Sequence, residues 1–85
     1  MQLNGLSVLM TGGASGLGAA TARAMAAKGA KVAVLDMNKA AAEQVASEIG
    51  GVALIADVAE EAPVKAALAA AEAAHGIVRI LVNCA

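Results

Sequence analysis

The sequence contains no phenylalanine, tryptophan or tyrosine, and it has only one cysteine and one proline. Without aromatic rings, a hydrophobic core must be built from Val, Ile, Leu, Met and Ala side chains. The single cysteine, Cys84, excludes a disulfide within the chain and is typical of a reducing compartment. We therefore expect a cytoplasmic protein whose core is made of small and medium-sized aliphatic residues.

Charge is also scarce, because only 15% of the 85 residues are charged and the net charge is −1 without any basic run. This balance argues against nucleic acid or an anionic membrane as a partner. No apolar run approaches the ~18 residues of a membrane span, and the first residues lack the basic flank of a signal peptide. At 60% hydrophobic residues, the chain is more apolar than a small free-standing domain usually needs. We therefore expect part of its surface to pack against something else.

Short apolar runs alternate with Ala-rich stretches along the whole chain. We predict strands at residues 6–10, 31–35, 52–56 and 77–82, of which the first two are apolar enough to be buried in a parallel sheet. Helices are predicted at residues 17–28, 39–49 and 60–75, each followed by a glycine. The order βαβαβαβ predicts an α/β fold of the Rossmann type, with right-handed crossovers and a parallel sheet.

Two details of the helices follow from residue types and spacing. Asn38 is placed to cap the second helix, and Pro63 is tolerable in the first turn of the third, where backbone N–H groups lack helical partners. On the first helix, a 3.6-residue period predicts an inner face formed by Leu17, Ala20, Thr21, Ala24 and Met25. On the third helix, the same period predicts an inner face formed by Val64, Ala67, Leu68 and Ala71.

A glycine loop joins the first predicted strand to the first predicted helix, since residues 11–18 read Thr-Gly-Gly-Ala-Ser-Gly-Leu-Gly. Gly12 permits a sharp exit from the strand, Gly16 lets the backbone approach a ligand, and Gly18 allows close helix–sheet packing. Backbone N–H groups of residues 15–17 would face phosphate oxygens, and the Ser15 hydroxyl would add a hydrogen bond. The alternative interpretation is a glycine-rich turn without a ligand.

An aspartate follows the second predicted strand, 18 residues beyond Gly18. At about this spacing, dinucleotide-binding proteins place an acid against the adenosine ribose hydroxyls. The Asp36 carboxylate would repel the 2′-phosphate of NADP by up to about 4 kcal/mol per unit charge at ~4 Å and an effective dielectric of ~20. Neither Ser15 nor Met37 supplies a compensating cation, so the expected cofactor is NAD. A solvated turn aspartate is the alternative.

Three motifs together resemble the short-chain dehydrogenase/reductase family. The pattern Thr11-Gly12-x-x-x-Gly16-x-Gly18 is similar to the family's glycine motif, and Asp57-Val58 is similar to its adenine-contacting pair. Residues 81–85 (Leu-Val-Asn-Cys-Ala) resemble the family's N-N-A-G motif, with cysteine at the second Asn position. The amino-acid sequences of the glycine loop and of the Val-Asn-Cys-Ala ending are most similar to those of the type-2 3-hydroxyacyl-CoA dehydrogenase branch, which also acts on hydroxysteroids.

The resemblance covers nearly the whole chain and implies a sheet with strand order 3-2-1-4 that stops after the fourth strand. It also implies which residues line the NAD site: Gly12, Ser15, Gly16, Leu17, Gly18, Asp36, Asp57, Val58, Asn83, Cys84 and Ala85. Among these, Asn83 resembles a structural Asn that ties neighbouring strands together.

The chain departs from the family pattern at three places. Ala59 stands where a Thr or Ser often caps the third helix, which forfeits ~1 kcal/mol. Arg79 stands where an Asp is common, and His75 where an aromatic residue is usual. Neither His75 nor Cys84 has partners of a catalytic motif, so we expect His75 only to end a helix, where a positive charge is mildly favoured, and Cys84 to be a small buried residue beside the cofactor. We expect no catalytic residue and no metal site in this chain.

The family transfers a hydride between a nicotinamide and an alcohol or ketone, using a Ser, a Tyr and a Lys four residues after the Tyr. This chain has no tyrosine, so it cannot host that mechanism alone. We therefore expect residues 1–85 to be the N-terminal NAD-binding part of a single Rossmann domain, without its catalytic half. The parent would be an NAD-dependent dehydrogenase of a small-molecule substrate, of the 3-hydroxyacyl-CoA or hydroxysteroid type, and a homo-oligomer, by resemblance a tetramer.

Two alternatives stay open at this point. The first is a stand-alone, non-catalytic dinucleotide-binding module. The second is a methyltransferase, which also combines a glycine loop with an acid after the second strand. The spacing of the glycine motif and the Asp57-Val58 pair argue against the methyltransferase.

Overall fold

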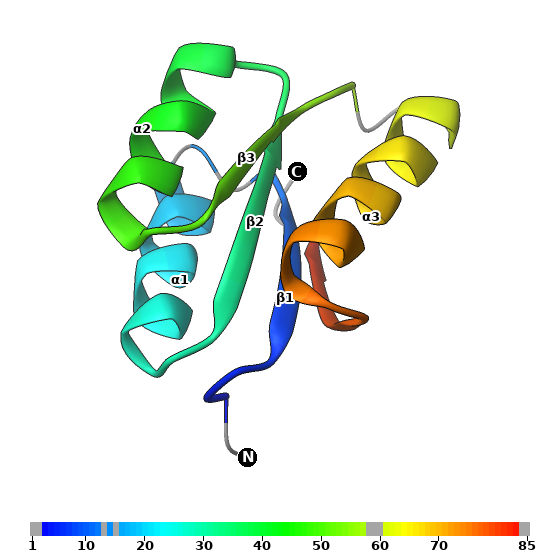
Figure 1. Ribbon diagram of the computed structural model, residues 1–85. Coiled ribbons are helices and arrows are strands. Elements are labelled where there is room, and N and C mark those ends of the chain that lie inside the picture. Colours follow the sequence, from blue (N-terminus) through cyan, green and yellow to red (C-terminus); the bar gives the residue numbers. More distant parts are fainter. Residues whose placement is uncertain (1–2, 13, 15, 58–60, 84–85) are drawn as a thin grey trace.

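The computed structural model describes residues 3–12, 14, 16–57 and 61–83, in which strands and helices alternate. The elements are β1 (Ser7–Thr11), α1 (Gly16–Ala27), β2 (Lys31–Asp36), α2 (Lys39–Ile49), β3 (Val52–Ile55), α3 (Glu61–His75) and β4 (Val78–Asn83). The strands form one parallel sheet in the order β3-β2-β1-β4 (Figure 1). The predicted fold and strand order are confirmed, and element bounds differ from the prediction by no more than one residue.

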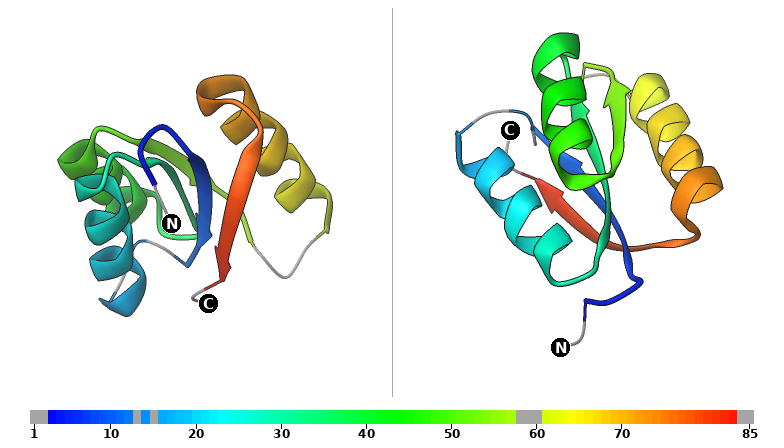
Figure 2. Two further views of the ribbon diagram at one scale, coloured as in Figure 1. Left: turned by 90° about the horizontal axis from the view of Figure 1, so that it is seen from below. Right: turned by 60° about the vertical axis from the view of Figure 1, so that its left-hand side comes forward.

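Helices cover both faces of the sheet, with α1 and α2 on one face and α3 on the other (Figures 1 and 2). Because successive side chains of a strand point to opposite faces, β1 and β2 contribute to two separate apolar clusters. Strand residues of the first cluster pack with side chains of α1 and α2, and they are Val8, Met10, Val32 and Val34. Strand residues of the second cluster pack with Ala67 and Ala71 of α3, and they are Leu9, Ala33 and Leu35. The core is therefore aliphatic, as the absence of aromatic residues requires.

The inner face of α1 agrees with the prediction only in part: Met25 packs against the first apolar cluster, whereas Ala20 is exposed. Gly18, Ala19 and Ala22 are buried, whereas Leu17 is 78% exposed and Ala24 also faces solvent. Since α1 consists largely of Ala and Gly, the size and polarity of its residues give little contrast between its faces. The buried residues are a glycine and two alanines, which lets the helix backbone lie close to the strands.

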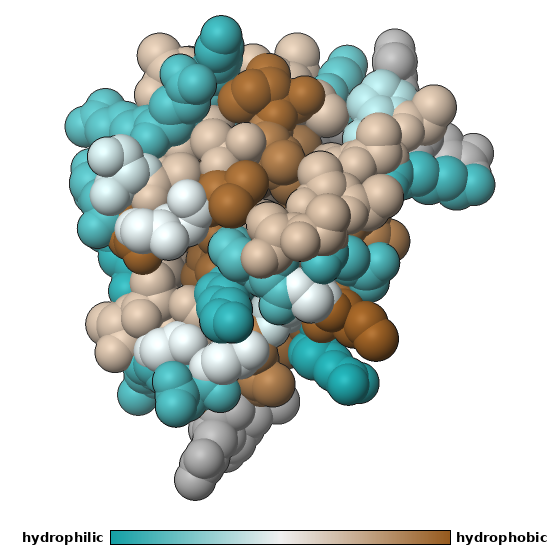
Figure 3. Space-filling model, in the orientation of Figure 1, coloured by the Kyte–Doolittle hydropathy of each residue, from teal (hydrophilic) through white to brown (hydrophobic). Residues whose placement is uncertain are grey.

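The second face of the sheet is covered less completely than the first. Ala67 and Ala71 of α3 are buried as predicted, but Leu68 is 38% exposed, contrary to the prediction. Leu81 of β4 pairs in register with the buried Leu9 and is nevertheless 65% exposed. In the space-filling view, hydrophobic side chains gather over β3 and between β3 and α3, while hydrophilic ones cover α2 (Figure 3). Apolar surface therefore remains uncovered along β4 and α3.

Both ends of α2 follow the expected capping rules. The side-chain oxygen of Asn38 accepts a hydrogen bond from the Ala41 backbone N–H at 3.1 Å. Gly50 ends the helix with φ +66, a left-handed conformation that favours glycine. In the part of the chain that the structure describes, no helix is long and apolar enough to cross a membrane.

The close packing of α1 on the sheet leads to a stability prediction. Ala22→Leu is expected to lower the free energy of unfolding by about 1–3 kcal/mol, because the larger side chain overfills a fully buried position. Ala24→Leu makes the same change on the exposed face and is expected to alter stability by no more than about 0.5 kcal/mol. Urea denaturation of the two variants measures the difference, and equal losses would contradict the observed face of α1.

Candidate functional site

The carboxyl ends of the strands bring the predicted site residues to one edge of the sheet. β1 lies between β2 and β4, so the glycine loop after β1 has Asp36 at the end of β2 on one side and Asn83 at the end of β4 on the other. The chain proceeds from β1 to β2 and β3 in one direction and returns to β4 on the other side of β1. Ligands of open α/β sheets bind at such a switch in strand order.

The glycine loop leaves β1 through a backbone conformation that favours glycine. Gly12 has φ +68, and its N–H donates to the Leu35 carbonyl at 2.8 Å, which fixes the start of the loop against β2. Gly16 begins α1 with φ +50, and a Cβ added there would meet no atom of the other described residues outside its own helical turn within 4 Å. The space beside Gly16 is therefore open, and the chain itself requires glycine only for the positive φ. Gly18 is buried against the sheet, as its predicted packing role requires.

Asp36 contacts the glycine loop, which sequence reasoning did not predict. One carboxylate oxygen, Oδ2, accepts a hydrogen bond from the Ala14 N–H at 3.2 Å, and the other, Oδ1, accepts from the Asn38 N–H at 3.0 Å. Asp36 is half-buried at the end of β2. Its carboxylate thus links the middle of the glycine loop to the start of α2. The spacing that singled out Asp36 does not reveal which backbone donors it meets.

Thr11 and Asn83 join the ends of β1 and β4. The Thr11 hydroxyl lies 2.9 Å from the Asn83 Oδ1 and 3.4 Å from the Val82 carbonyl oxygen. A hydroxyl donates one hydrogen, so the shorter contact to Asn83 is the better hydrogen bond. This tie between strands is the role that the resemblance suggested for Asn83. The sequence prediction named Thr11 only as the first residue of the glycine motif. Its position opposite Asn83 follows from the observed pairing of β1 with β4.

The remaining predicted residues are only partly described by the structure. Asp57 follows β3 at the same edge and is half-buried. Two large apolar side chains, Leu17 and Met37, are 78% and 66% exposed where α1 begins and where β2 ends. Four of the residues predicted to line the site lie outside the described residues, namely Ser15, Val58, Cys84 and Ala85, as does Ala59.

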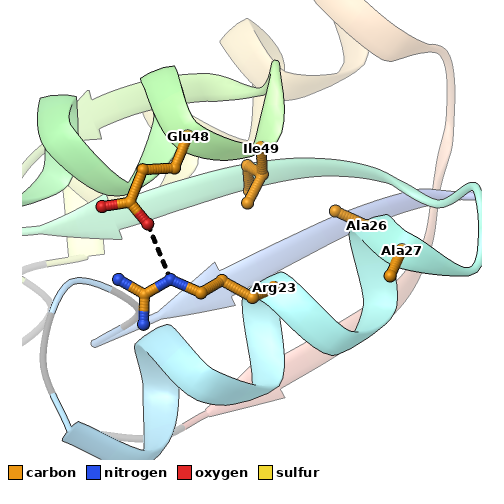
Figure 4. A pocket seen from close by; sticks show the side chains of 5 residues that line it. All are labelled: Arg23, Ala26, Ala27, Glu48 and Ile49. Carbon is orange, nitrogen blue, oxygen red and sulfur yellow. Dashed lines mark hydrogen bonds and ion pairs between the residues drawn. The ribbon is translucent and has the colours of Figure 1, made fainter.

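A pocket of about 330 Å³ lies elsewhere, between α1 and α2 (Figure 4). It is lined by Arg23, Ala26, Ala27, Glu48 and Ile49. These residues belong to the second half of α1 and the end of α2, so the pocket lies at the end of the helices remote from the glycine loop. Such an open hollow between two helix surfaces has none of the loop N–H groups or strand-end carboxylates that would recognise a dinucleotide.

An ion pair borders this pocket. Arg23 Nε donates to Glu48 Oε2 at 2.7 Å. This hydrogen bond holds the pKa of the Glu48 carboxyl below its ordinary value and raises the pKa of Arg23. Because both side chains are exposed to screening by water and salt, the pair contributes little to stability.

His75 does not join the site at the carboxyl edge. It is the last residue of α3, whose end lies toward the opposite edge of the sheet (Figure 1). Its Nδ1 is buried and has no hydrogen-bond partner among the described residues. Within the same part of the chain, no group of three or more His, Cys, Asp and Glu residues could hold a metal ion.

Comparison with known proteins gives consistent matches over nearly the whole chain. Residues 7–85 match the family model of short chain dehydrogenases. D-threitol dehydrogenase of Mycolicibacterium smegmatis is 45% identical, and the match covers 99% of this chain and 34% of that protein. Human 3-hydroxyacyl-CoA dehydrogenase type-2 is 41% identical, with 98% of this chain and 33% of that protein covered.

A solved structure shows the same arrangement of helices and strands. The crystal structure of 3-ketoacyl-(acyl-carrier-protein) reductase from Brucella melitensis, complexed with NADH, matches with a TM-score of 0.90 and 47% identity. The match covers 93% of this chain and 34% of that chain. The present chain thus spans about a third of the length of the relatives that it matches.

The tie between β1 and β4 can be tested by removing one hydroxyl. Thr11→Val keeps the shape of the side chain but loses the bond to Asn83, and we expect the free energy of unfolding to fall by about 0.5–1.5 kcal/mol. Thr21→Val is the matched control, because the Thr21 hydroxyl only donates to the Leu17 carbonyl of its own helix, at 2.8 Å on the surface. Thermal unfolding of both variants provides the comparison. An equal or smaller loss for Thr11→Val would show that its bond to Asn83 does not hold β4 in place.

Proposed function

Since the chain belongs to the short-chain dehydrogenase family, we propose that it is the NAD(H)-binding part of a dehydrogenase and binds the dinucleotide at the carboxyl edge of its sheet. The observation that carries the proposal is the contact between the glycine loop and Asp36. A loop suited to pyrophosphate and a carboxylate suited to ribose lie on adjacent strands, joined by the Ala14 N–H. The NADH complex of the reductase from Brucella melitensis, similar over 93% of this chain, supports the proposal.

Each part of the site has a chemical task in this proposal. The start of α1 presents backbone N–H groups and the positive end of the helix dipole to the pyrophosphate. The open space beside Gly16 leaves room for phosphate oxygens. Asp36 accepts hydrogen bonds from the ribose hydroxyls, and Asp57 with Val58 contacts the adenine. The other residues proposed to line the site are Gly12, Ser15, Leu17, Gly18, Asn83, Cys84 and Ala85.

The charge of the edge favours NAD over NADP. Asp36 has one unit of negative charge at the position of the ribose hydroxyls, and Asp57 adds another at the same edge. The residue that follows Asp36 is Met37, which offers no cation to a 2′-phosphate. Repulsion of a like charge at ~4 Å amounts to up to about 4 kcal/mol at an effective dielectric of ~20, so the site discriminates against the phosphorylated cofactor.

The reaction proposed for the parent protein is hydride transfer between a secondary alcohol and a ketone. When bound, the nicotinamide ring accepts or supplies the hydride. The chain holds and orients the dinucleotide, but it has no tyrosine, so the family's acid/base residues must come from outside these 85 residues. Residues 1–85 therefore correspond to the first part of a single Rossmann domain.

The substrate class rests on a short stretch of sequence. The Val-Asn-Cys-Ala wording and the 41% identity to human 3-hydroxyacyl-CoA dehydrogenase type-2 support a 3-hydroxyacyl-CoA or hydroxysteroid substrate. D-threitol dehydrogenase, which is 45% identical, acts on a different class of alcohol. The substrate-binding residues of the parent therefore decide between these substrate classes. The single cysteine supports a cytoplasmic location, and apolar surface along β4 and α3 supports burial in a larger, oligomeric parent.

Two glycines at positive φ, Gly16 and Gly50, test the proposal. Gly16→Ala and Gly50→Ala each place a Cβ in open space at positive φ, which strains each backbone by roughly 1–2 kcal/mol. Only Gly16 faces the proposed pyrophosphate, so we expect Gly16→Ala to weaken NADH binding about tenfold or more, equivalent to at least ~1.4 kcal/mol. Gly50→Ala is expected to bind NADH as the unsubstituted chain does.

Isothermal titration with NADH measures both affinities, and thermal unfolding confirms that the two variants are comparably folded. Equal NADH affinities of the two variants would contradict the assigned pyrophosphate position. Binding of NADH together with absence of dehydrogenase activity in the full parent would instead favour a non-catalytic dinucleotide-binding module.

A further inference from the structure

Asp36 makes a contact that recognition of a ribose does not require. Its Oδ2 accepts a hydrogen bond from the Ala14 N–H, in the glycine loop 22 residues earlier, while its Oδ1 accepts from the Asn38 N–H. Both oxygens are therefore held by backbone donors, which fixes the plane of the carboxylate. A side chain that served the ribose alone would need neither bond.

Such a contact restrains the glycine loop at Ala14, between glycines at its two ends. The loop runs between Gly12 and Gly16, both at positive φ, and glycine has more conformational freedom to lose than any other residue. The loop's start is held by the Gly12 N–H on the Leu35 carbonyl. Its middle is held by the Ala14 side chain, which is 8% exposed in the first apolar cluster, and by the bond from Ala14 to Asp36.

We propose that Asp36 is a positioning residue for the glycine loop, which it holds through Ala14 in the conformation that presents N–H groups to the pyrophosphate. This inference rests on the proposed NAD binding and extends it. A carboxylate has about four lone-pair sites, so the bonds to Ala14 and Asn38 leave sites for ribose hydroxyls. One side chain thus couples the ribose end of the dinucleotide to its phosphate end.

The inference makes a prediction opposite in sign to the effect of charge alone. Asp36→Asn keeps the shape of the side chain, but its amide nitrogen cannot accept, so at most one of the two backbone bonds survives. Removing a negative charge near a pyrophosphate would by itself strengthen phosphate binding. If Asp36 positions the loop, the same substitution weakens it.

The first test measures the loop without any ligand. Amide hydrogen exchange of the Ala14 N–H is expected to become about tenfold faster in Asp36→Ala, which removes both acceptor oxygens, as loss of a bond to a charged acceptor implies. The Gly12 N–H, which donates to a backbone carbonyl at 2.8 Å, serves as the internal control and should keep its protection. Unchanged exchange at Ala14, with Gly12 protected in both proteins, would overturn the proposal.

The second test uses an NAD analogue whose adenosine ribose lacks both the 2′- and 3′-hydroxyls. This analogue keeps the pyrophosphate but offers Asp36 no ribose hydroxyl. We expect Asp36→Asn to weaken binding of the analogue about tenfold, and binding of NAD by more. Glu43→Gln removes an equal charge from an exposed position of α2 and should leave both affinities unchanged.

The outcomes separate this inference from the function on which it rests. If Asp36→Asn weakens NAD but leaves the affinity of the analogue unchanged or increased, Asp36 acts on the ribose alone and the positioning role is overturned. If the unsubstituted chain binds neither compound, the proposed function fails, and the exchange of Ala14 alone decides whether Asp36 holds the loop.

Discussion

β1 is buried at the centre of the structure, and the positions of the neighbouring strands and helices depend on their packing against it. All five of its residues are buried, and its backbone pairs with β2 on one edge and β4 on the other. Its side chains enter both apolar clusters. The glycine loop starts from this strand, so a displacement of β1 would move the loop relative to Asp36 and Asn83 together. The geometry of the candidate site thus depends on the burial of one short aliphatic strand.

The elements and their order could be predicted because each is delimited by residues with strong local preferences. Apolar runs of five or six residues predicted the strands, and Asn38 and Gly50 predicted the ends of α2. The face of α1 was predicted only in part, because Met25 is the one large apolar side chain that it packs against the first apolar cluster and its other buried residues are Ala and Gly. Its one leucine, Leu17, is exposed at the edge where the site lies. Because Leu17 is apolar, the helical period wrongly placed it on the inner face.

The site was predictable in its residue types and positions along the chain, but not in its internal contacts. Asp36 was found from its distance along the sequence to the glycine motif. The bonds from Ala14 to Asp36 and from Thr11 to Asn83 depend on strand register and side-chain conformation, which no local pattern encodes. The pairing of β1 with β4 even includes an irregularity between Ser7 and Val8. Found only in the structure, these contacts join the ends of β1 and β4 and tie the glycine loop to the end of β2.

Some of the apolar residues that make the composition unusually hydrophobic are exposed at and beside β4. β4 pairs with β1 alone among the described strands. Leu81 of β4 is 65% exposed, and Ile77, just before β4, is 66% exposed. The chain spans about a third of the relatives that it matches. In the proposed parent, further parts of the domain would cover this surface, whereas the carboxyl edge with its glycine loop is formed by the present residues.

The central claim is that the carboxyl edge binds NAD. The most direct measurement titrates the ¹⁵N-labelled chain with NADH and with NADPH and follows the backbone amide signals. The account predicts saturable shifts at Ala14, Gly16 and Asn38, with NADH bound at least about tenfold tighter than NADPH, a ratio equal to ~1.4 kcal/mol. Shifts centred on Arg23 and Ile49 of the pocket between α1 and α2, or equal affinities for the two cofactors, would contradict it.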